Sequence, residues 1–165
     1  MKENLLLSLI ENDARISVKD LAAALNETEE TVQDTLNALQ KEKVIGGYHT
    51  VIDWNKTNTA QVSAMIIVGA TPEREYGYER IAEEIYRFPE VDTMYLMSGK
   101  GEFTVTINGK TMQDIANFVA TKLACIDGVT STSTLFVLKK YKSKGIIFDD
   151  KEDPSKERLI VTPWY

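Results

Sequence analysis

The chain has 165 residues, 43% of them hydrophobic, which is enough for one medium domain or for two smaller ones. No apolar run approaches the roughly 18 residues of a membrane span, and the first residues lack the layout of a signal peptide. The single cysteine, Cys125, excludes a disulfide within the chain, and the single histidine, His49, excludes clusters of histidine metal ligands. We therefore expect a cytoplasmic protein with no membrane partner, no cofactor and no metal site.

The formal net charge of −6 is unevenly distributed along the chain. Residues 1–50 hold five Lys and Arg against nine Asp and Glu, a balance of −4. Residues 51–144 hold eleven of each, and residues 145–165 hold three against five. Because neutralisation of phosphates supplies most of the non-specific affinity for DNA, this balance counts against a DNA-binding role for the first 50 residues.

The first 43 residues have the pattern of three helices. Residues 2–13 predict a helix whose buried face is formed by Leu5, Leu6, Leu9 and Ile10. Ser17 is expected to cap a second helix, and Asn26 to make the left-handed turn that ends it. Thr28 is expected to cap a longer third helix with a polar outer face. This is the helix-turn-helix pattern, although an ordinary helical hairpin with a solvated outer face has the same periodicity.

The spacing of the apolar residues changes after the third helix. Residues 43–53 contain β-forming side chains around Gly46 and Gly47, and they predict a strand or a short β-ribbon that leaves the helical domain. Residues 54–60 are polar and have no apolar period, so we expect a connector there.

From residue 61 onward, β-patterns and α-patterns alternate. Strands are expected at residues 62–69, 91–98, 102–108 and 129–141, and helices at residues 72–88 and 112–126. A tight turn at residues 99–101 joins the second and third strands. The order β-α-β-β-α-β is the split βαβ, ferredoxin-like arrangement, in which two helices cover one face of an antiparallel sheet. The fold class is therefore α+β.

Two further surfaces of this second domain are predicted to meet a partner. Met94, Leu96 and Leu135 indicate an apolar surface beyond the core, and we expect a homodimer through this domain. The last segment, residues 143–165, is charged but contains an apolar run near its end. We expect that tail to dock on this domain or on a partner subunit.

The chain resembles the Lrp/AsnC, or feast/famine, family of bacterial and archaeal transcription regulators. The resemblance covers most of residues 1–141, and its specificity comes from the order and spacing of several motifs. They are DARIS at 13–17, DLAAAL at 20–25, VIGGY at 44–48, ID at 52–53, FPEV at 88–91, YLMSGKGEF at 95–103, KLACIDGV at 122–129 and STSTLFVLKKYK at 131–142.

The resemblance implies a domain layout and a mechanism. Residues 1–50 would form a winged helix-turn-helix domain that binds double-stranded DNA, residues 51–60 a hinge, and residues 61–142 a domain for effector binding and oligomerisation. Members are typically homodimers that assemble into tetramers or octamers. The effector is commonly an amino acid bound between subunits, and it would change the affinity for the operator or the assembly state.

The family's effector site maps onto the turn between the second and third strands. We expect an effector-binding site formed by Ser98, Gly99, Gly101, Glu102, Thr132 and Thr134. Glycine-rich backbone offers N–H groups to a carboxylate, and an acidic side chain can pair with an α-amino group. The sequence has Gly101-Glu102 where the family usually has an aromatic residue followed by Asp. In the alternative interpretation, the glycines only form a hairpin and Glu102 is a solvated strand residue.

The outer face of the third helix carries the expected DNA contacts. These are Thr31, Gln33, Asn37, Lys41 and Lys43, of which the two amides have the chemistry for bidentate contacts to adenine. The family usually places basic residues on this helix, whereas Glu30 and Asp34 lie on its outer face here. We therefore expect DNA binding that depends more on salt and on assembly than is usual for the family.

Two other functions remain open. The first is an effector-sensing oligomeric modulator whose acidic helix-turn-helix no longer binds DNA strongly. The second is an enzyme similar to the siroheme decarboxylases, which share this two-domain architecture. Such an enzyme would need several His and Arg residues around a large anionic tetrapyrrole, whereas this chain has one His. We expect a regulator and not an enzyme.

Overall fold

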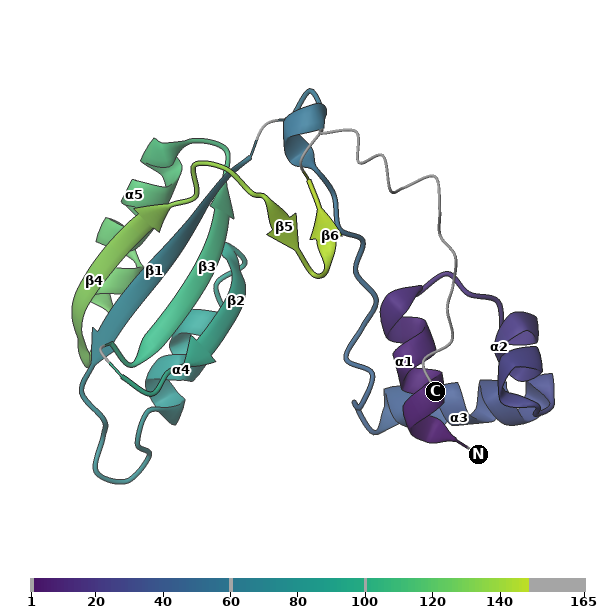
Figure 1. Ribbon diagram of the computed structural model, residues 1–165. Helices are drawn as coiled ribbons and strands as arrows, with labels where there is room; N and C mark the ends of the chain where they lie inside the picture. Colours follow the sequence, from purple (N-terminus) through teal and green to yellow (C-terminus); the bar gives the residue numbers. More distant parts are fainter. Residues whose placement is uncertain (1, 60, 100, 149–165) are drawn as a thin grey trace. The chain divides into compact units, whose positions relative to one another are not determined.

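The computed structural model describes residues 2–59, 61–99 and 101–148, and the chain divides into two compact units, Met1–Val51 and Ile52–Tyr165 (Figure 1). None of the helices in these ranges is long and apolar enough to cross a membrane. Most of the tail that the sequence predicts to dock, residues 149–165, lies outside the described residues.

The N-terminal unit consists of three helices: α1 (Glu3–Asn12), α2 (Val18–Leu25) and α3 (Glu29–Lys41). The predicted caps are confirmed. The Ser17 hydroxyl accepts a hydrogen bond from the Asp20 N–H at 3.1 Å, and the Thr28 hydroxyl accepts one from the Thr31 N–H at 3.2 Å. Asn26 ends α2 in the left-handed conformation, with φ 56° and ψ 49°. The Ser17 and Thr28 side chains therefore satisfy N–H groups that the first turns of α2 and α3 leave unpaired.

One apolar cluster holds the three helices together. It consists of the buried residues Leu6, Leu21, Ala22, Leu25, Val32, Leu36 and Leu39. The expectation that Leu5 is buried is wrong, since its side chain is 40% exposed. The buried stripe of α1 is centred on Leu6 and continues through Leu9 and Ile10, and a helix rotates Leu5 about 100° away from Leu6.

The strand or β-ribbon expected at residues 43–53 is not found. All of these residues are described, and none of them lies in a strand, so the predicted wing is wrong as a β-ribbon within the chain. A β-strand needs a ladder partner. None of the described segments of the chain pairs with this one. The segment instead leaves α3 through Lys43 at φ 59°, and the Ile45 N–H donates to the Leu39 carbonyl.

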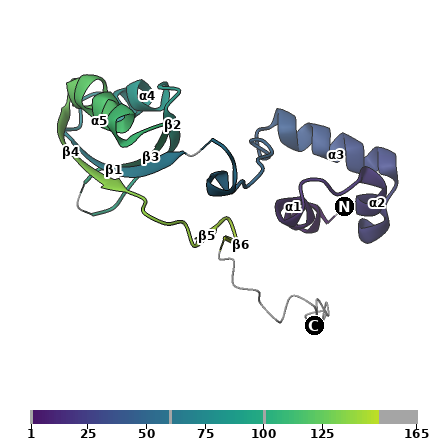
Figure 2. The same cartoon turned by 90° about the horizontal axis from the view of Figure 1, so that it is seen from above.

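The C-terminal unit is built on a four-stranded antiparallel sheet with two helices on one face (Figures 1 and 2). Its elements are β1 (Val62–Ala70), α4 (Glu79–Tyr86), β2 (Val91–Leu96), β3 (Phe103–Gly109), α5 (Met112–Thr121) and β4 (Val129–Phe136). The strands lie in the order β2-β3-β1-β4. A mixed α+β fold with an antiparallel sheet is therefore confirmed.

Four elements of this unit are shorter than predicted, and one of them is β2, which ends at Leu96 and not at Ser98. Helix α4 begins at Glu79 and not at Pro72, because reciprocal backbone hydrogen bonds between Glu73 and Gly77 close a loop before it. Helix α5 ends at Thr121, and the chain continues as a 3-10 turn at Leu123–Cys125. Strand β4 ends at Phe136, which pairs with Ala64, and beyond it a single hydrogen bond from the Val137 N–H to the Ser63 carbonyl continues the contact with β1.

Two short strands and a 3-10 turn complete the described chain. The turn (Trp54–Lys56) lies in the predicted connector. The strands β5 (Lys142–Ser143) and β6 (Ile146–Ile147) pair as a small hairpin beyond the four-stranded sheet.

The core of the C-terminal unit follows from alternation along the two central strands. Ala64, Ile66 and Val68 of β1, together with Phe103, Val105 and Ile107 of β3, are buried against α4 and α5. We call this side of the sheet the helix face and the opposite side the open face. Burial of each large apolar side chain contributes about 1.5–3 kcal/mol, so the buried set keeps the register of the whole sheet.

The apolar residues of the open face differ from those that the sequence suggested. Met94 pairs with Val105 and Leu96 with Phe103, so both lie on the helix face. Leu135 lies opposite Met65 on the open face, as expected. The exposed apolar side chains there are Met65, Tyr95 and Leu135, and Ile67 lies between them, half-buried.

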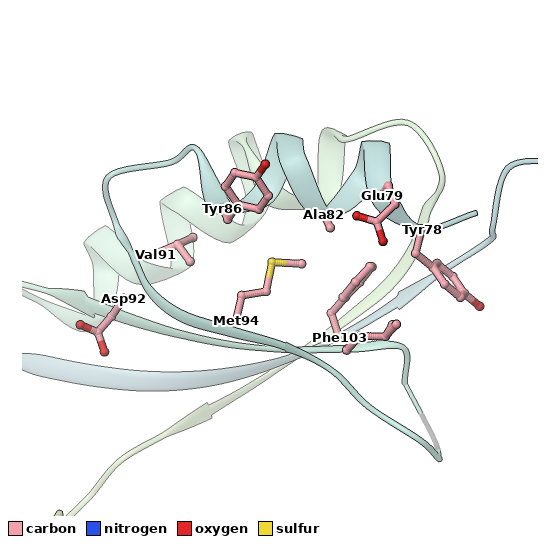
Figure 3. A pocket seen from close by; sticks show the side chains of 9 residues that line it. Tyr78, Glu79, Ala82, Tyr86, Val91, Asp92, Met94 and Phe103 are labelled. Carbon is pink, nitrogen blue, oxygen red and sulfur yellow. The ribbon is translucent and has the colours of Figure 1, made fainter. Parts of the chain in front are cut away.

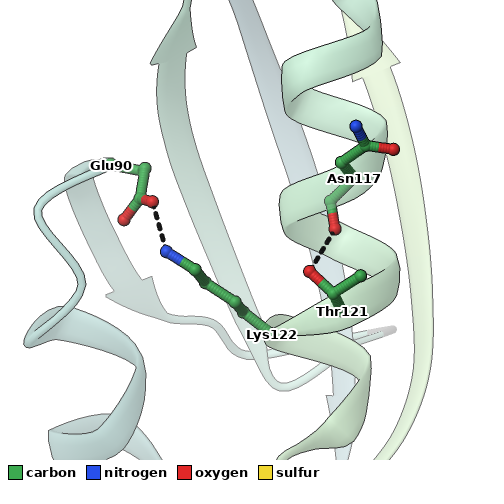
Figure 4. A network of polar contacts seen from close by, with 4 residues as sticks. All are labelled: Glu90, Asn117, Thr121 and Lys122. Carbon is green, nitrogen blue, oxygen red and sulfur yellow. Dashed lines mark hydrogen bonds and ion pairs between the residues drawn. The ribbon is translucent and has the colours of Figure 1, made fainter.

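One ion pair joins the end of α5 to the start of β2 (Figure 4). The ammonium group of Lys122 lies 2.5 Å from Glu90 Oε1, and it also lies over the rings of Phe88 and Phe118. The second carboxylate oxygen of Glu90 is buried and has no hydrogen-bond partner. The hydrogen bond from Lys122 holds the pKa of Glu90 below its ordinary value of 4.5, and it outweighs the opposing effect of burial.

Replacing Glu90 by Gln should make the protein less stable at pH 7 by about 0.5–1 kcal/mol, the upper range for partly exposed pairs. Because the pKa of Glu90 is lowered on folding, its contribution is present above about pH 4.5 and is lost as the pH falls through the folded pKa. The difference between the two proteins should thus be constant from pH 7 to about 5 and disappear at lower pH. Urea denaturation at each pH measures this. Exposed Glu75, which none of the described ion pairs includes, provides the control Glu75→Gln for the lost charge, and a difference that persists at pH 3 would contradict the account.

Candidate functional site

The outer face of α3 is the first candidate site. Thr31, Gln33, Asn37 and Lys41 are all exposed on it, and Lys43 is exposed just beyond its end. The Gln33 side chain donates a hydrogen bond to the Asn37 side-chain oxygen at 3.0 Å, so the two amides lie together one turn apart. The Thr31 hydroxyl is already within 2.8 Å of the Thr28 hydroxyl at the helix cap.

The charges on the same face oppose an approach to DNA. Glu30 and Asp34 are exposed alongside the amides, and neither forms an ion pair in the part of the chain that the structure describes. The positive charges of Lys41 and Lys43 stand at the far end of the helix. The geometry thus offers a hydrogen-bonded pair of amides for contacts to bases, with little positive charge nearby to bind phosphates.

The second candidate site is the loop between β2 and β3. A hydrogen bond from the Met97 N–H to the Glu102 carbonyl closes the loop, and Ser98 and Gly99 are exposed at its tip. Gly101 has φ 83°, and a Cβ there would lie 2.4 Å from Ile67 Cγ2. Only glycine fits this close approach to the open face, which accounts for the missing aromatic side chain at this position.

Glu102 is held in place by the irregularity at the end of β1. The register between β1 and β4 shifts between Gly69 and Ala70. The carboxylate of Glu102 accepts a hydrogen bond from the Ala70 N–H at 2.7 Å at this point. Glu102 is therefore half-buried and oriented, and it is not the freely solvated strand residue of the alternative interpretation.

Two hydroxyl groups lie near the Glu102 carboxylate. A Cβ placed on Gly69 would lie 2.4 Å from Ser131 Oγ, 3.0 Å from Thr130 Oγ1 and 3.6 Å from Glu102 Oε2. We call these three side chains the Gly69 cluster. One carboxylate with two hydroxyls is a suitable partner for a protonated amino group. The sequence pattern did not indicate Thr130 and Ser131, and the only signal for them was the glycine at the end of β1.

Thr132 and Thr134 are not part of this group. Thr132 lies opposite Val68 and Thr134 opposite Ile66, and both partners are buried on the helix face. Directly opposed residues share a face of the sheet, so these threonines point away from Glu102. The expectation that they face the same ligand as Glu102 is wrong within one chain.

A separate pocket lies between α4 and β2 (Figure 3). Its volume is about 390 Å³, and its lining is mainly aromatic and apolar, with two acidic residues: Tyr78, Glu79, Ala82, Tyr86, Val91, Asp92, Met94, Leu96 and Phe103. None of the predicted effector residues lines it. Among the described residues there is no cluster of His, Cys, Asp or Glu suited to a metal ion.

Comparison with known proteins relates both units to one kind of protein. The family model of the Lrp/AsnC ligand-binding domain matches residues 63–147. YugG of Bacillus subtilis, described as an uncharacterised HTH-type transcriptional regulator, is 40% identical over 163 residues, which cover 98% of this chain and 97% of YugG.

Solved structures agree with the fold. A Neisseria meningitidis transcriptional regulator in complex with L-methionine has a TM-score of 0.65 at 20% identity, covering 84% of this chain and 88% of that one. A feast or famine regulatory protein of Mycobacterium tuberculosis, complexed with L-methionine, has a TM-score of 0.68 at 17% identity, covering 85% and 92%. At these identities, the likeness shows the fold alone.

The contact between Gly101 and Ile67 can be tested with a pair of glycine substitutions. Gly101→Ala should lower the free energy of unfolding by about 1–3 kcal/mol more than Gly99→Ala, because the new methyl group overpacks against Ile67. Both glycines have positive φ, but a Cβ at Gly99 meets nothing within 4 Å, so it is the matched control. Urea denaturation gives both values, and equal losses would show that the loop does not pack on β1.

Proposed function

Because the chain belongs to the Lrp/AsnC family of transcriptional regulators, we propose that it binds double-stranded DNA through α3 and responds to a small effector, an amino acid in class. The relative with 40% identity over nearly the whole length is named as an HTH-type transcriptional regulator. The observation that carries the DNA-binding part is the exposed Gln33–Asn37 amide pair on a helix whose other face is buried. The named relatives also favour a regulator over an enzyme.

The DNA contacts would divide between bases and phosphates. Gln33 and Asn37 offer a donor and an acceptor each, the chemistry that reads the N6 and N7 edge of adenine. Thr31 at the start of the helix, with Lys41 and Lys43 at its end, would contact phosphates on the two sides of the groove. Glu30 and Asp34 repel the same phosphates, so we infer that α3 by itself neutralises few phosphates and binds DNA weakly.

The effector would bind at the Gly69 cluster, with the carboxylate of Glu102 on its amino group. Two relatives of the same fold were solved with L-methionine, which supports the amino-acid class. The exposed open face, with Met65, Tyr95 and Leu135, favours a homodimer through the sheet, from which tetramers or octamers would assemble. A regulator of this kind needs an effector whose affinity differs between the two assembly or DNA-binding states.

The role of α3 can be tested with a matched pair of double variants. Operator fragments are first selected from genomic DNA with the wild-type protein. Gln33→Ala with Asn37→Ala should then weaken operator binding by about 1–3 kcal/mol, or fivefold to a hundredfold, because base contacts are lost. Gln113→Ala with Asn117→Ala removes the same kind of amide pair from the exposed face of α5 and should leave DNA binding unchanged.

Fluorescence anisotropy with labelled operator measures both dissociation constants. Equal affinities for the two double variants would contradict the assignment of α3. If the wild-type protein retained no DNA at low salt, the alternative of a sensing modulator that does not bind DNA would replace the proposed regulator.

The effector site can be tested by thermal shift against the amino acids, beginning with L-methionine. A ligand at about one hundred times its dissociation constant stabilises the protein by about 2.7 kcal/mol, which is readily measured. Glu102→Gln should abolish this shift while its side-chain oxygen still accepts the Ala70 N–H. The fold and the basal DNA affinity should therefore persist.

Tyr86→Ala is the control, because Tyr86 lines the α4–β2 pocket and is exposed. Loss of the shift in Tyr86→Ala but not in Glu102→Gln would move the effector to that pocket. If none of the amino acids stabilised the wild-type protein, the proposed effector class would be wrong.

A further inference from the structure

A small hairpin beyond the four-stranded sheet carries a concentration of positive charge. Residues 139–148, here called the lysine hairpin, contain Lys139, Lys140, Lys142 and Lys144 around the paired strands β5 and β6. The two central residues of its turn, Lys144 and Gly145, have φ values of 48° and 82°. Positive φ at both positions is characteristic of the type I′ turn, which closes a two-residue hairpin tightly.

The hairpin lies in a stretch of the sequence without acidic residues, and Asp149 and Asp150 follow that stretch directly. Residues 128–148 contain no Asp or Glu, so this stretch carries +4. The whole chain carries −6, which leaves −10 for the remaining residues. The N-terminal unit, where the DNA-reading helix lies, is itself acidic. Residues 128–148 thus combine four positive charges with none of the negative charges that the first 50 residues carry in excess.

The lysine side chains are available for a partner. Lys140, Lys142 and Lys144 are exposed, and none of them forms an ion pair with a described carboxylate. Elsewhere in the same unit, Arg80, Arg87 and Lys122 are all paired with glutamates. Unpaired lysines close together repel one another, so an anionic partner would relieve that repulsion.

Aromatic rings stiffen the hairpin. Lys139 Nζ lies 4.6 Å from the centre of the Tyr141 ring, and Lys140 Nζ lies 5.9 Å from the centre of the Phe148 ring. The Phe148 N–H also donates to the Tyr141 carbonyl at 2.9 Å. Cation–π contacts and this hydrogen bond restrict the lysine stems, which lowers the entropy lost when the ammonium groups bind phosphates.

We propose that the lysine hairpin binds the phosphates of duplex DNA and supplies the non-specific affinity that the acidic α3 unit lacks. The inference rests on the proposed DNA-binding function. Lysines contact phosphates as point charges and carry no sequence information, so the hairpin would add affinity and α3 would add specificity. This division explains how an acidic reading domain remains compatible with DNA.

The test compares two triple variants in the full chain. Lys140→Gln, Lys142→Gln and Lys144→Gln together remove three charges from the hairpin, and Lys139 is kept because its ammonium group lies closer to an aromatic ring than that of Lys140. The matched control is Arg74→Gln, Arg87→Gln and Lys110→Gln, which removes three exposed charges elsewhere in the same unit. Dissociation constants for the operator and for unrelated duplex DNA are measured by anisotropy from 50 to 200 mM salt.

The hairpin variant should show a slope of log K against log salt that is smaller by about 2.7, at about 0.9 for each lost phosphate contact. Between 50 and 200 mM salt, the ratio of the wild-type affinity to the affinity of the hairpin variant would then fall by about fortyfold. The ratio of operator to unrelated-DNA affinity should stay unchanged, and the control variant should keep the wild-type slope.

Each other outcome decides a different point. Equal slopes for the two variants would overturn the hairpin inference while the regulator proposal stands. Loss of binding only in the hairpin variant, with Gln33 and Asn37 dispensable, would keep the hairpin and overturn the role of α3. Absence of any DNA binding by the wild-type protein would remove both proposals. If the hairpin variant lost binding to phosphatidylglycerol vesicles and kept its DNA slope, the partner would be a membrane surface and the inference would be wrong.

Discussion

The structure of the C-terminal unit depends on alternate burial along its two central strands. Every second residue of β1 and β3 is sealed against α4 and α5, and a slip of one residue would expose this whole set to water. Apolar burial therefore holds the register of the central strands. The positions of the polar candidates follow from it, because Glu102 precedes the buried Phe103 and Ser131 lies opposite Gly69 on the open face. The chemistry of the candidate effector site is thus a consequence of how the core packs.

Sequence reasoning predicted what local patterns determine and failed where tertiary pairing decides. The caps at Ser17 and Thr28 and the turn at Asn26 depend on neighbouring backbone groups, so they could be read from the chain. The faces of Thr132 and Met94 depend on which strand lies beside them and on register shifts at Gly69 and near Val91. The missing β-ribbon at residues 43–53 is a similar case, because β-forming residues do not specify a ladder partner.

In the proposed function, the distribution of charge assigns base contacts to the N-terminal unit and most phosphate contacts to the C-terminal unit. The N-terminal unit presents a hydrogen-bonded amide pair but is acidic, and the C-terminal unit presents the lysine hairpin. Specific contacts without phosphate neutralisation would be weak at physiological salt, and phosphate contacts without base contacts would not select an operator. A regulator built in this way needs both units on one duplex. An effector that changes the assembly would then change the DNA affinity that the base contacts and the phosphate contacts produce together.

The central claim is that the outer face of α3 reads adenine in a major groove. The most direct measurement is the affinity of the wild-type protein for a selected operator in which single adenines are replaced by 7-deazaadenine, which lacks the N7 acceptor but keeps base pairing. The account predicts weaker binding at one or two positions in each half-site, and no such loss for the protein without the Gln33 and Asn37 amides. Unchanged wild-type affinity at every substituted position would contradict it.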